Sequence, residues 1–103
     1  MRASSSVSKP AGAGRYRVMV VDDSAAVRGF FRRTLEADPA IEVVASVGNG
    51  QAAVDALGRA SVDVIVLDIE MPVMDGMTAL PKLLAVDASV RIVMASTLTL
   101  ANA

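Results

Sequence analysis

The chain has 103 residues, a formal net charge of −1 and an apolar fraction of 53%. This is enough for one domain with a packed core, and the balanced charge argues against a nucleic-acid-binding surface. The sequence contains no Cys and no His, which excludes disulfides, thiolate-bound or His-bound zinc, phosphohistidine and a Ser-His-Asp triad within these residues. Any acid–base or metal chemistry must therefore come from carboxylates.

The N-terminal segment and the length of the apolar runs indicate where in the cell the protein is expected. Residues 1–14 are rich in Ser, Pro and Gly without apolar periodicity, so we expect a flexible tail there and one domain over residues 15–103. No apolar run approaches the ~18 residues of a membrane span, and the N-terminus lacks the apolar core of a signal peptide. We expect a soluble cytoplasmic protein with no membrane contact.

Short apolar runs alternate with helical patterns along the chain. In chain order we predict a strand over 16–21, a helix over 24–37, a strand over 41–47, a helix over 51–59, a strand over 62–67, a helix over 76–86 and a strand over 90–95. The strand runs are apolar on both faces, which is typical of parallel strands covered on both sides. The order β-α-β-α-β-α-β therefore predicts the α/β class, an open parallel sheet with helices on both faces.

The helical segments carry apolar stripes. The first helix places one stripe of residues at helical spacing, namely Val27, Phe30, Phe31, Thr34 and Leu35. The third places Met77, Leu80 and Leu84 on one face. Pro81 removes one intrahelical hydrogen bond there, so we predict a kink or an irregular first turn.

Three acids end two of the predicted strands: Asp22 and Asp23 follow the first, and Asp68 follows the third. Ligands of open α/β sheets bind outside the carboxyl ends of the strands, so these carboxylates converge if the two strands are neighbours. Like charges a few Å apart repel, and a divalent cation relieves that repulsion. Oxygen ligands without Cys or His suit Mg²⁺ or Mn²⁺. The alternative for the Asp pair alone is an ordinary turn and helix cap.

Three separated blocks carry a family resemblance. They read Val-Val-Asp-Asp-Ser at 20–24, Val-Leu-Asp-Ile-Glu-Met-Pro-Val-Met-Asp-Gly at 66–76 and Val-Met-Ala-Ser at 93–96. In residues and in spacing they resemble the receiver domain of bacterial two-component response regulators. The resemblance implies a flavodoxin-like receiver fold and a phosphorylation-controlled regulatory function.

The resemblance also implies residue roles. Asp68 matches the phospho-acceptor, which takes its phosphoryl group from a histidine kinase. Asp23 matches a direct Mg²⁺ ligand, Asp22 an acid that binds the metal mostly through water, and the backbone carbonyl of Glu70 a third protein ligand. Ser96 matches the hydroxyl residue that hydrogen-bonds the phosphoryl oxygens.

Other polar residues have structural interpretations. Ser24 and Asp75 are predicted to cap the helices that follow them. Arg28, Arg32 and Arg33 are predicted to form a solvated helix face.

Segments 17–25, 38–45 and 96–99 resemble one subtype, the regulatory domain of the chemotaxis protein-glutamate methylesterase. The esterase domain of that enzyme has no counterpart here, so we expect this chain to be a regulatory domain and not an enzyme. The implied partners are a histidine kinase and an output domain or target protein.

The resemblance runs from about Tyr16 to Ala103 and ends just past the fourth strand, so we expect a receiver fold that is incomplete at the C-terminus. No Lys here replaces the one that pairs with the phosphoryl group in the family. We therefore expect weak or absent productive phosphorylation of these residues alone, and a homodimer through the exposed edge of strand four.

Two other functions stay open. One is a non-switching interaction or dimerisation module that keeps the receiver fold. The other is a small Mg²⁺-dependent phosphohydrolase with an Asp nucleophile. Such enzymes often have a general-acid Asp two residues after the nucleophile, and the Glu at position 70 argues against this function.

Overall fold

The structure is a computed structural model and describes residues 14–95. Its elements are, in chain order, β1 (Tyr16–Val21), α1 (Ala25–Glu36), β2 (Ile41–Val47), α2 (Gly50–Leu57), β3 (Val64–Asp68), α3 (Gly76–Val86) and β4 (Arg91–Ala95). The predicted order and type of every element are confirmed, and the ends differ by no more than about two residues, as is usual for helix and strand boundaries. The predicted tail at 1–14 falls almost wholly outside the described residues.

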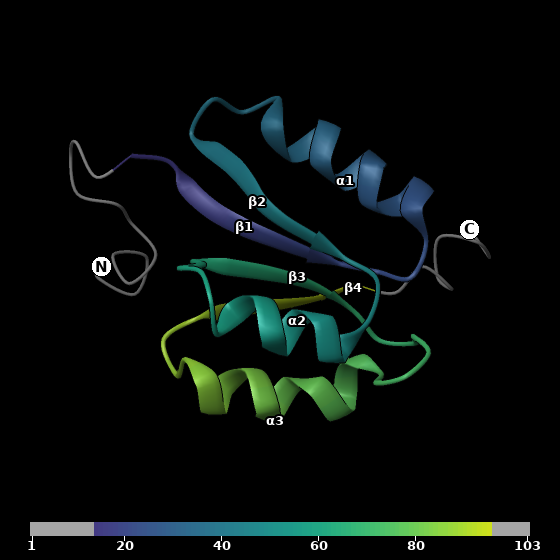
Figure 1. Cartoon of the computed structure of the whole chain (residues 1–103). Helices are drawn as coiled ribbons and strands as arrows, with labels where there is room; N and C mark the ends of the chain where they lie inside the picture. Colours follow the sequence, from purple (N-terminus) through teal and green to yellow (C-terminus); the bar gives the residue numbers. More distant parts are fainter. Residues whose placement is uncertain (1–13, 96–103) are drawn as a thin grey trace.

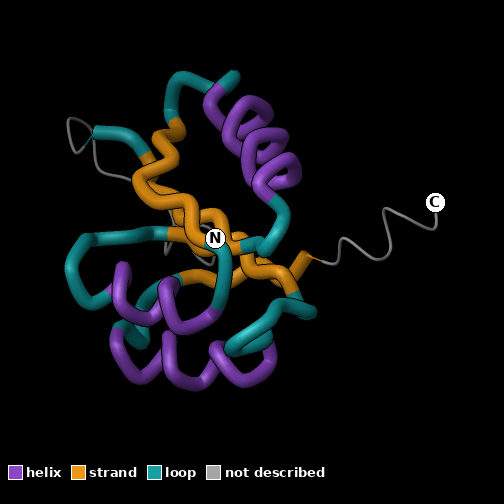
Figure 2. The backbone as a smooth tube through the Cα atoms, turned by 45° about the vertical axis from the view of Figure 1, so that its right-hand side comes forward, coloured by secondary structure: helices purple, strands orange, loops and turns teal. Residues whose placement is uncertain are grey.

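The four strands form one parallel sheet in the order β2-β1-β3-β4. Helix α1 covers one face, and α2 and α3 cover the other (Figure 1). Figure 2 shows the same three layers from a second direction. The predicted open α/β sheet is confirmed. Because β2 lies on one side of β1 and β3 on the other, the winding direction reverses between β1 and β3, and such a switch point is where these sheets bind ligands.

The central strands are apolar on both faces because both faces are covered. Along β1, Val18 and Val20 pack in the cluster under α1, whereas Met19 and Val21 pack in the cluster that includes α2 and α3. This alternation is the two-residue period of a strand. Met19 is fully buried, at 0% exposure. The core therefore fixes the register of β1 and with it the position of the residues that follow this strand.

Helix α1 buries a narrower stripe than its sequence predicts. Phe31 and Leu35 pack against the cluster on the α1 side of the sheet, but Phe30 is 53% exposed and Thr34 is exposed. Adjacent helical residues point about 100° apart, so only one of two neighbouring Phe residues can face the sheet. The prediction that Phe30 and Thr34 share the packed stripe was wrong.

Helix α3 does not pack against the sheet through Met77 and Leu84, whose side chains are 59% and 40% exposed. Its buried side chains are Ala79 and Leu83, one helical turn apart. Pro81 lies inside this helix, and the kink or irregular first turn expected there stays a prediction. No helix within residues 14–95 has both the length and the apolar character needed to cross a membrane.

Candidate metal site at the carboxyl edge of the sheet

Three acidic side chains meet where β1 and β3 end. Asp68 is the last residue of β3, and Asp22 directly follows β1, whose last residue Val21 pairs with Leu67. One carboxylate oxygen each of Asp22, Asp23 and Asp68 can be chosen so that all lie within 4.8 Å of one another. The predicted convergence of these three acids is therefore confirmed.

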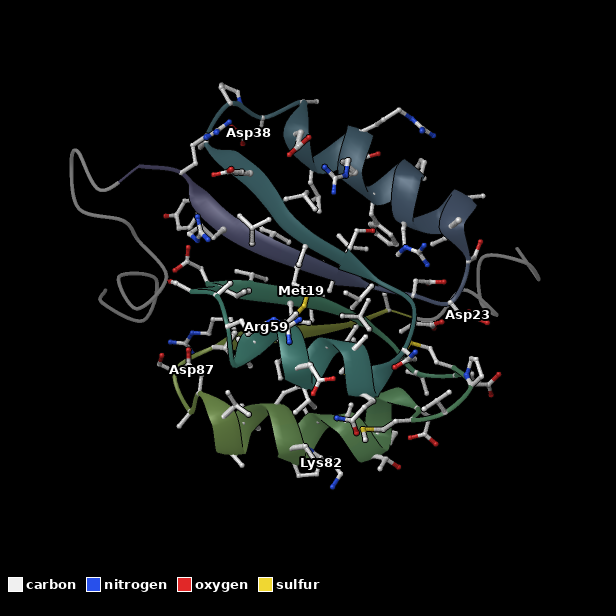
Figure 3. The ribbon with its side chains drawn as sticks, in the orientation of Figure 1. Met19, Asp23, Asp38, Arg59, Lys82 and Asp87 are labelled. Atoms are coloured by element: carbon white, nitrogen blue, oxygen red, sulfur yellow. The ribbon has the colours of Figure 1, made fainter. Side chains whose placement is uncertain are left out.

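The cluster combines two buried acids with one exposed acid. Asp22 and Asp68 are each only 2% exposed, and Asp23 is exposed. Figure 3 shows Asp23 at the edge where the strands end, far from Asp87 at the opposite edge. The site thus has an inner wall of carboxylate and an outer carboxylate that solvent can reach.

Asp22 is held at three points. Its backbone N–H donates to the carbonyl oxygen of Val47 at 3.1 Å, which ties the end of β1 to the end of β2. Its Oδ1 accepts the Ser24 backbone N–H at 2.9 Å, and its backbone carbonyl accepts Nη1 of Arg28 at 2.7 Å. The turn from β1 into α1 is therefore built around this residue.

Charge is costly in this pocket. Burial raises the pKa of the Asp22 carboxyl above its ordinary value, and the neighbouring Asp23 charge adds to the rise. The Ser24 N–H, the Arg28 guanidinium and a hydrogen bond with Asp68 act in the opposite direction and lower that pKa. Ionisation of Asp22 is therefore less favourable here than in water, and a bound cation would offset this cost.

The donor set fits a hard divalent cation. Mg²⁺ takes oxygen ligands at about 2.1 Å, so opposite ligands around it lie about 4.2 Å apart. Three carboxylates within 4.8 Å of one another need little movement, or one bridging water, to share such an ion. Asp22, Asp23 and Asp68 could hold Mg²⁺ or Mn²⁺.

The loop between β3 and α3 packs directly on the backbone of Asp68. The Gly76 N–H donates to the carbonyl oxygen of Ile69 at 2.7 Å, and a Cβ at Gly76 would collide with the Asp68 carbonyl. The side chain of Asp75 caps α3 by accepting the Thr78 N–H at 2.8 Å. The cap predicted for Asp75 is confirmed, and the start of α3 fixes the position of Asp68.

The same loop contains a strained residue. Val73 has φ 70°, in the left-handed region that β-branched side chains rarely adopt, and is 84% exposed. Glu70 is exposed on this loop, and the ligand role of its carbonyl stays a prediction. Ser96 lies outside the described residues.

The sequence predicted some supporting residues and missed others. Ser24 caps α1 as expected, its hydroxyl accepting the Val27 N–H at 3.2 Å. The cap of α2 is Asn49, which was missed, and its side chain accepts the Ala52 N–H at 2.9 Å.

Arg28 was also misplaced by the sequence prediction. It is half-buried and faces Asp22 instead of lying on the solvated face with Arg32. The available signal was its place in the first turns of α1, because helical side chains point back toward the helix N-terminus.

Known proteins support the same interpretation. The family model for the response regulator receiver domain matches residues 18–102. A protein-glutamate methylesterase/protein-glutamine glutaminase of Azospirillum brasilense is 69% identical over 93 residues, which are 90% of this chain and 24% of that protein. The chain thus spans about a quarter of the length of this curated relative.

Solved structures agree in fold. The response regulator domain of Thermotoga maritima CheB matches with a TM-score of 0.76 and 38% identity, over 82% of this chain and 63% of that one. A chain of the CheX-CheY-BeF3-Mg²⁺ complex from Borrelia burgdorferi matches with a TM-score of 0.73 and 26% identity, over 82% and 64%.

Proposed function

We propose that this chain, which belongs to the response regulator receiver domain family, accepts a phosphoryl group on Asp68 with the help of Mg²⁺ or Mn²⁺. The observation that carries the proposal is the placement of Asp68, buried at the end of β3 within a cluster of three carboxylates. A nucleophilic oxygen beside a cation-binding pair is what in-line phosphoryl transfer requires.

The proposed reaction is a simple displacement. A carboxylate oxygen of Asp68 attacks the phosphorus of a phosphohistidine, the new O–P bond forms and the P–N bond breaks. The electron pair of that bond stays on the imidazole, and the product is an aspartyl phosphate. A bound Mg²⁺ supplies positive charge against the phosphoryl oxygens.

Each remaining site residue has an assigned role. Asp23 would bind the metal directly, Asp22 would bind it mostly through water, and the carbonyl of Glu70 would provide another ligand. Ser96 hydrogen-bonds the phosphoryl oxygens. The carboxylate cluster supports metal binding by Asp22 and Asp23, and the family resemblance supports the division of roles between them and the roles of Glu70 and Ser96.

The partners follow from the relatives. The similarity to protein-glutamate methylesterases supports a regulatory domain of a chemotaxis response regulator, with a histidine kinase as donor and an output domain or target protein as receiver of the signal. In this proposal the chain itself is not an enzyme. A cytoplasmic location is part of the same proposal.

Acetyl phosphate as a small donor, with Mg²⁺ and intact mass measurement, tests this function. The sequence allows either weak or absent phosphorylation of these residues, and the proposal requires the first: a phosphoryl adduct that forms slowly, is absent with EDTA and is absent from Asp68→Asn. No adduct on the wild-type chain would overturn the proposal. Release of phosphate with continuous turnover would instead indicate a phosphohydrolase.

A second candidate, a non-switching interaction module, is favoured by the edge of the sheet at β4. Within residues 14–95 no strand pairs with the outer side of β4, and Val93 on this strand is 53% exposed. Beside it lies an apolar cavity of about 390 Å³, lined by side chains that include Val66, Val93 and Ala95. Exposed apolar strand edges pair with other chains, so we propose homodimerisation through β4. A monomer in sedimentation at high micromolar concentration would contradict this.

A further inference from the structure

We propose that Arg28 is a positioning residue of the acid cluster, whose guanidinium fixes the peptide between Asp22 and Asp23 and so presents the Asp23 carboxylate to a divalent cation. The inference rests on the proposed function, because it assumes that the cluster binds Mg²⁺. It adds a residue that none of the acid or hydroxyl roles above includes.

The contact is short and charge-assisted. Nη1 of Arg28 donates to the backbone carbonyl oxygen of Asp22 at 2.7 Å. A hydrogen bond with an ionised donor is about twice as strong as a neutral one. The same Nη1 lies 3.5 Å from the place where a Cβ on Gly48 would stand, so the guanidinium fits between α1 and the turn from β2 to α2.

The acceptor of this hydrogen bond is the backbone carbonyl oxygen of Asp22, which belongs to the peptide unit that leads to Asp23. A peptide unit is planar, so a bond to the Asp22 carbonyl fixes the plane that also contains the Asp23 N–H and Cα. The other two hydrogen bonds of Asp22 do not involve this peptide plane. The bond to Val47 uses the Asp22 N–H, which belongs to the preceding peptide, and the bond from Ser24 uses the side-chain Oδ1. Arg28 therefore controls the direction in which Asp23 leaves the turn.

Asp23 needs such control more than its neighbours do. Asp22 and Asp68 are buried and confined by packing, whereas Asp23 is exposed. In residues 14–95 no hydrogen bond holds the Asp23 carboxylate. Its place within 4.8 Å of the other two acids depends on the backbone that carries it.

Positioning and charge predict opposite results when Arg28 is replaced. A guanidinium near the cluster repels a cation, so if charge alone mattered, its removal would tighten Mg²⁺ binding. If Arg28 positions Asp23, its removal weakens binding, because ligand-supporting contacts typically contribute about 10- to 100-fold in metal affinity. Because the guanidinium also lowers the pKa of Asp22, the variant Arg28→Lys, which keeps the charge, is needed beside the sign of the change to separate the two effects.

The experiment measures the Mg²⁺ dissociation constant by calorimetry at a temperature where circular dichroism shows each variant folded. We expect Arg28→Met to weaken binding by ~10-fold. Arg28→Lys keeps the charge without the planar fork and should fall between Met and wild type. Arg32→Met removes an exposed Arg from the same helix and should match wild type.

Unchanged or tighter binding by folded Arg28→Met would overturn the proposal, as would absence of Mg²⁺ binding by the wild-type chain. Acetyl phosphate labelling of the wild type separates this inference from the proposed function. Metal binding that depends on Arg28 without any labelling would refute the phospho-acceptor role and support the positioning role.

Discussion

Replacement of Gly76 by Ala tests how tightly the start of α3 is packed against Asp68. A Cβ at this position would come well inside 3.0 Å of the Asp68 carbonyl oxygen, and it would meet the Asp68 carbonyl carbon and the Ile69 Cα at 3.0 Å each. All three atoms belong to the backbone, so no side chain can rotate away. Either α3 or the end of β3 must move.

The cost follows from that movement. Displacing α3 breaks or weakens the hydrogen bond from the Gly76 N–H to the Ile69 carbonyl, which is 2.7 Å long and contributes about 1 kcal/mol. Overpacking of a fixed site adds about 1–3 kcal/mol. Ala returns up to about 1 kcal/mol through its helix propensity. We expect Gly76→Ala to lower the free energy of unfolding by about 2 kcal/mol, a fall in Tm of roughly 8–16 °C for a domain of this size.

Gly29→Ala is the matched control, with the same chemical change inside α1. Its Cβ would meet only the end of the Arg33 side chain, at 3.3 Å, and that flexible group can move. Gly29→Ala should therefore raise stability by about 0.5–1 kcal/mol. Urea and thermal unfolding followed by circular dichroism measure both. A Gly76→Ala chain as stable as wild type would refute this account of the packing.

Three further variants address the site and its loop. Val73→Gly should raise stability by about 1 kcal/mol in urea unfolding, because the left-handed φ of 70° strains Val but not Gly, and a loss would contradict the strain. Burial raises the pKa of Asp22 above 3.8, so the contribution of this carboxyl to the stability of the metal-free wild type should be lost as pH rises from 3.8 through that raised pKa. Asp22→Asn should remove this loss and also reduce the rise in Tm that Mg²⁺ gives; a parallel pH profile would count against it. The Thr78 N–H lowers the pKa of Asp75 below 3.8, so this cap stabilises above that pH and its contribution disappears as pH falls through the lowered pKa. Asp75→Asn keeps a capping side chain and should show a flatter acid limb, and an unchanged limb would exclude the cap as its source.

The fold was predictable because local patterns and global packing agree. The strand β1 is apolar at every core position, and two acids follow its last residue, Val21, which marks its end. The convergence of Asp22 and Asp68 also required β1 and β3 to be neighbours, a condition that the sequence left open and that the strand order fulfils.

Tertiary details were less predictable because they depend on which side of a helix meets the sheet. Phe30 and Phe31 are equivalent in hydrophobicity, and only the rotation of α1 makes one exposed and the other packed. Arg28 and Arg32 are the same residue type on the same helix, yet the place of Arg28 in the first turn of α1 brings its guanidinium to the backbone carbonyl of Asp22. Such contacts arise from three-dimensional placement and leave little trace in periodicity.

Chemical trapping of the phosphorylated residue tests the central claim most directly. Borohydride converts an aspartyl phosphate to homoserine, and peptide mass mapping then identifies the position. After incubation with acetyl phosphate and Mg²⁺, we predict homoserine at position 68 and none when EDTA replaces the metal. Homoserine at position 22 or 23, or at no position, would contradict the assignment of Asp68 as the phospho-acceptor.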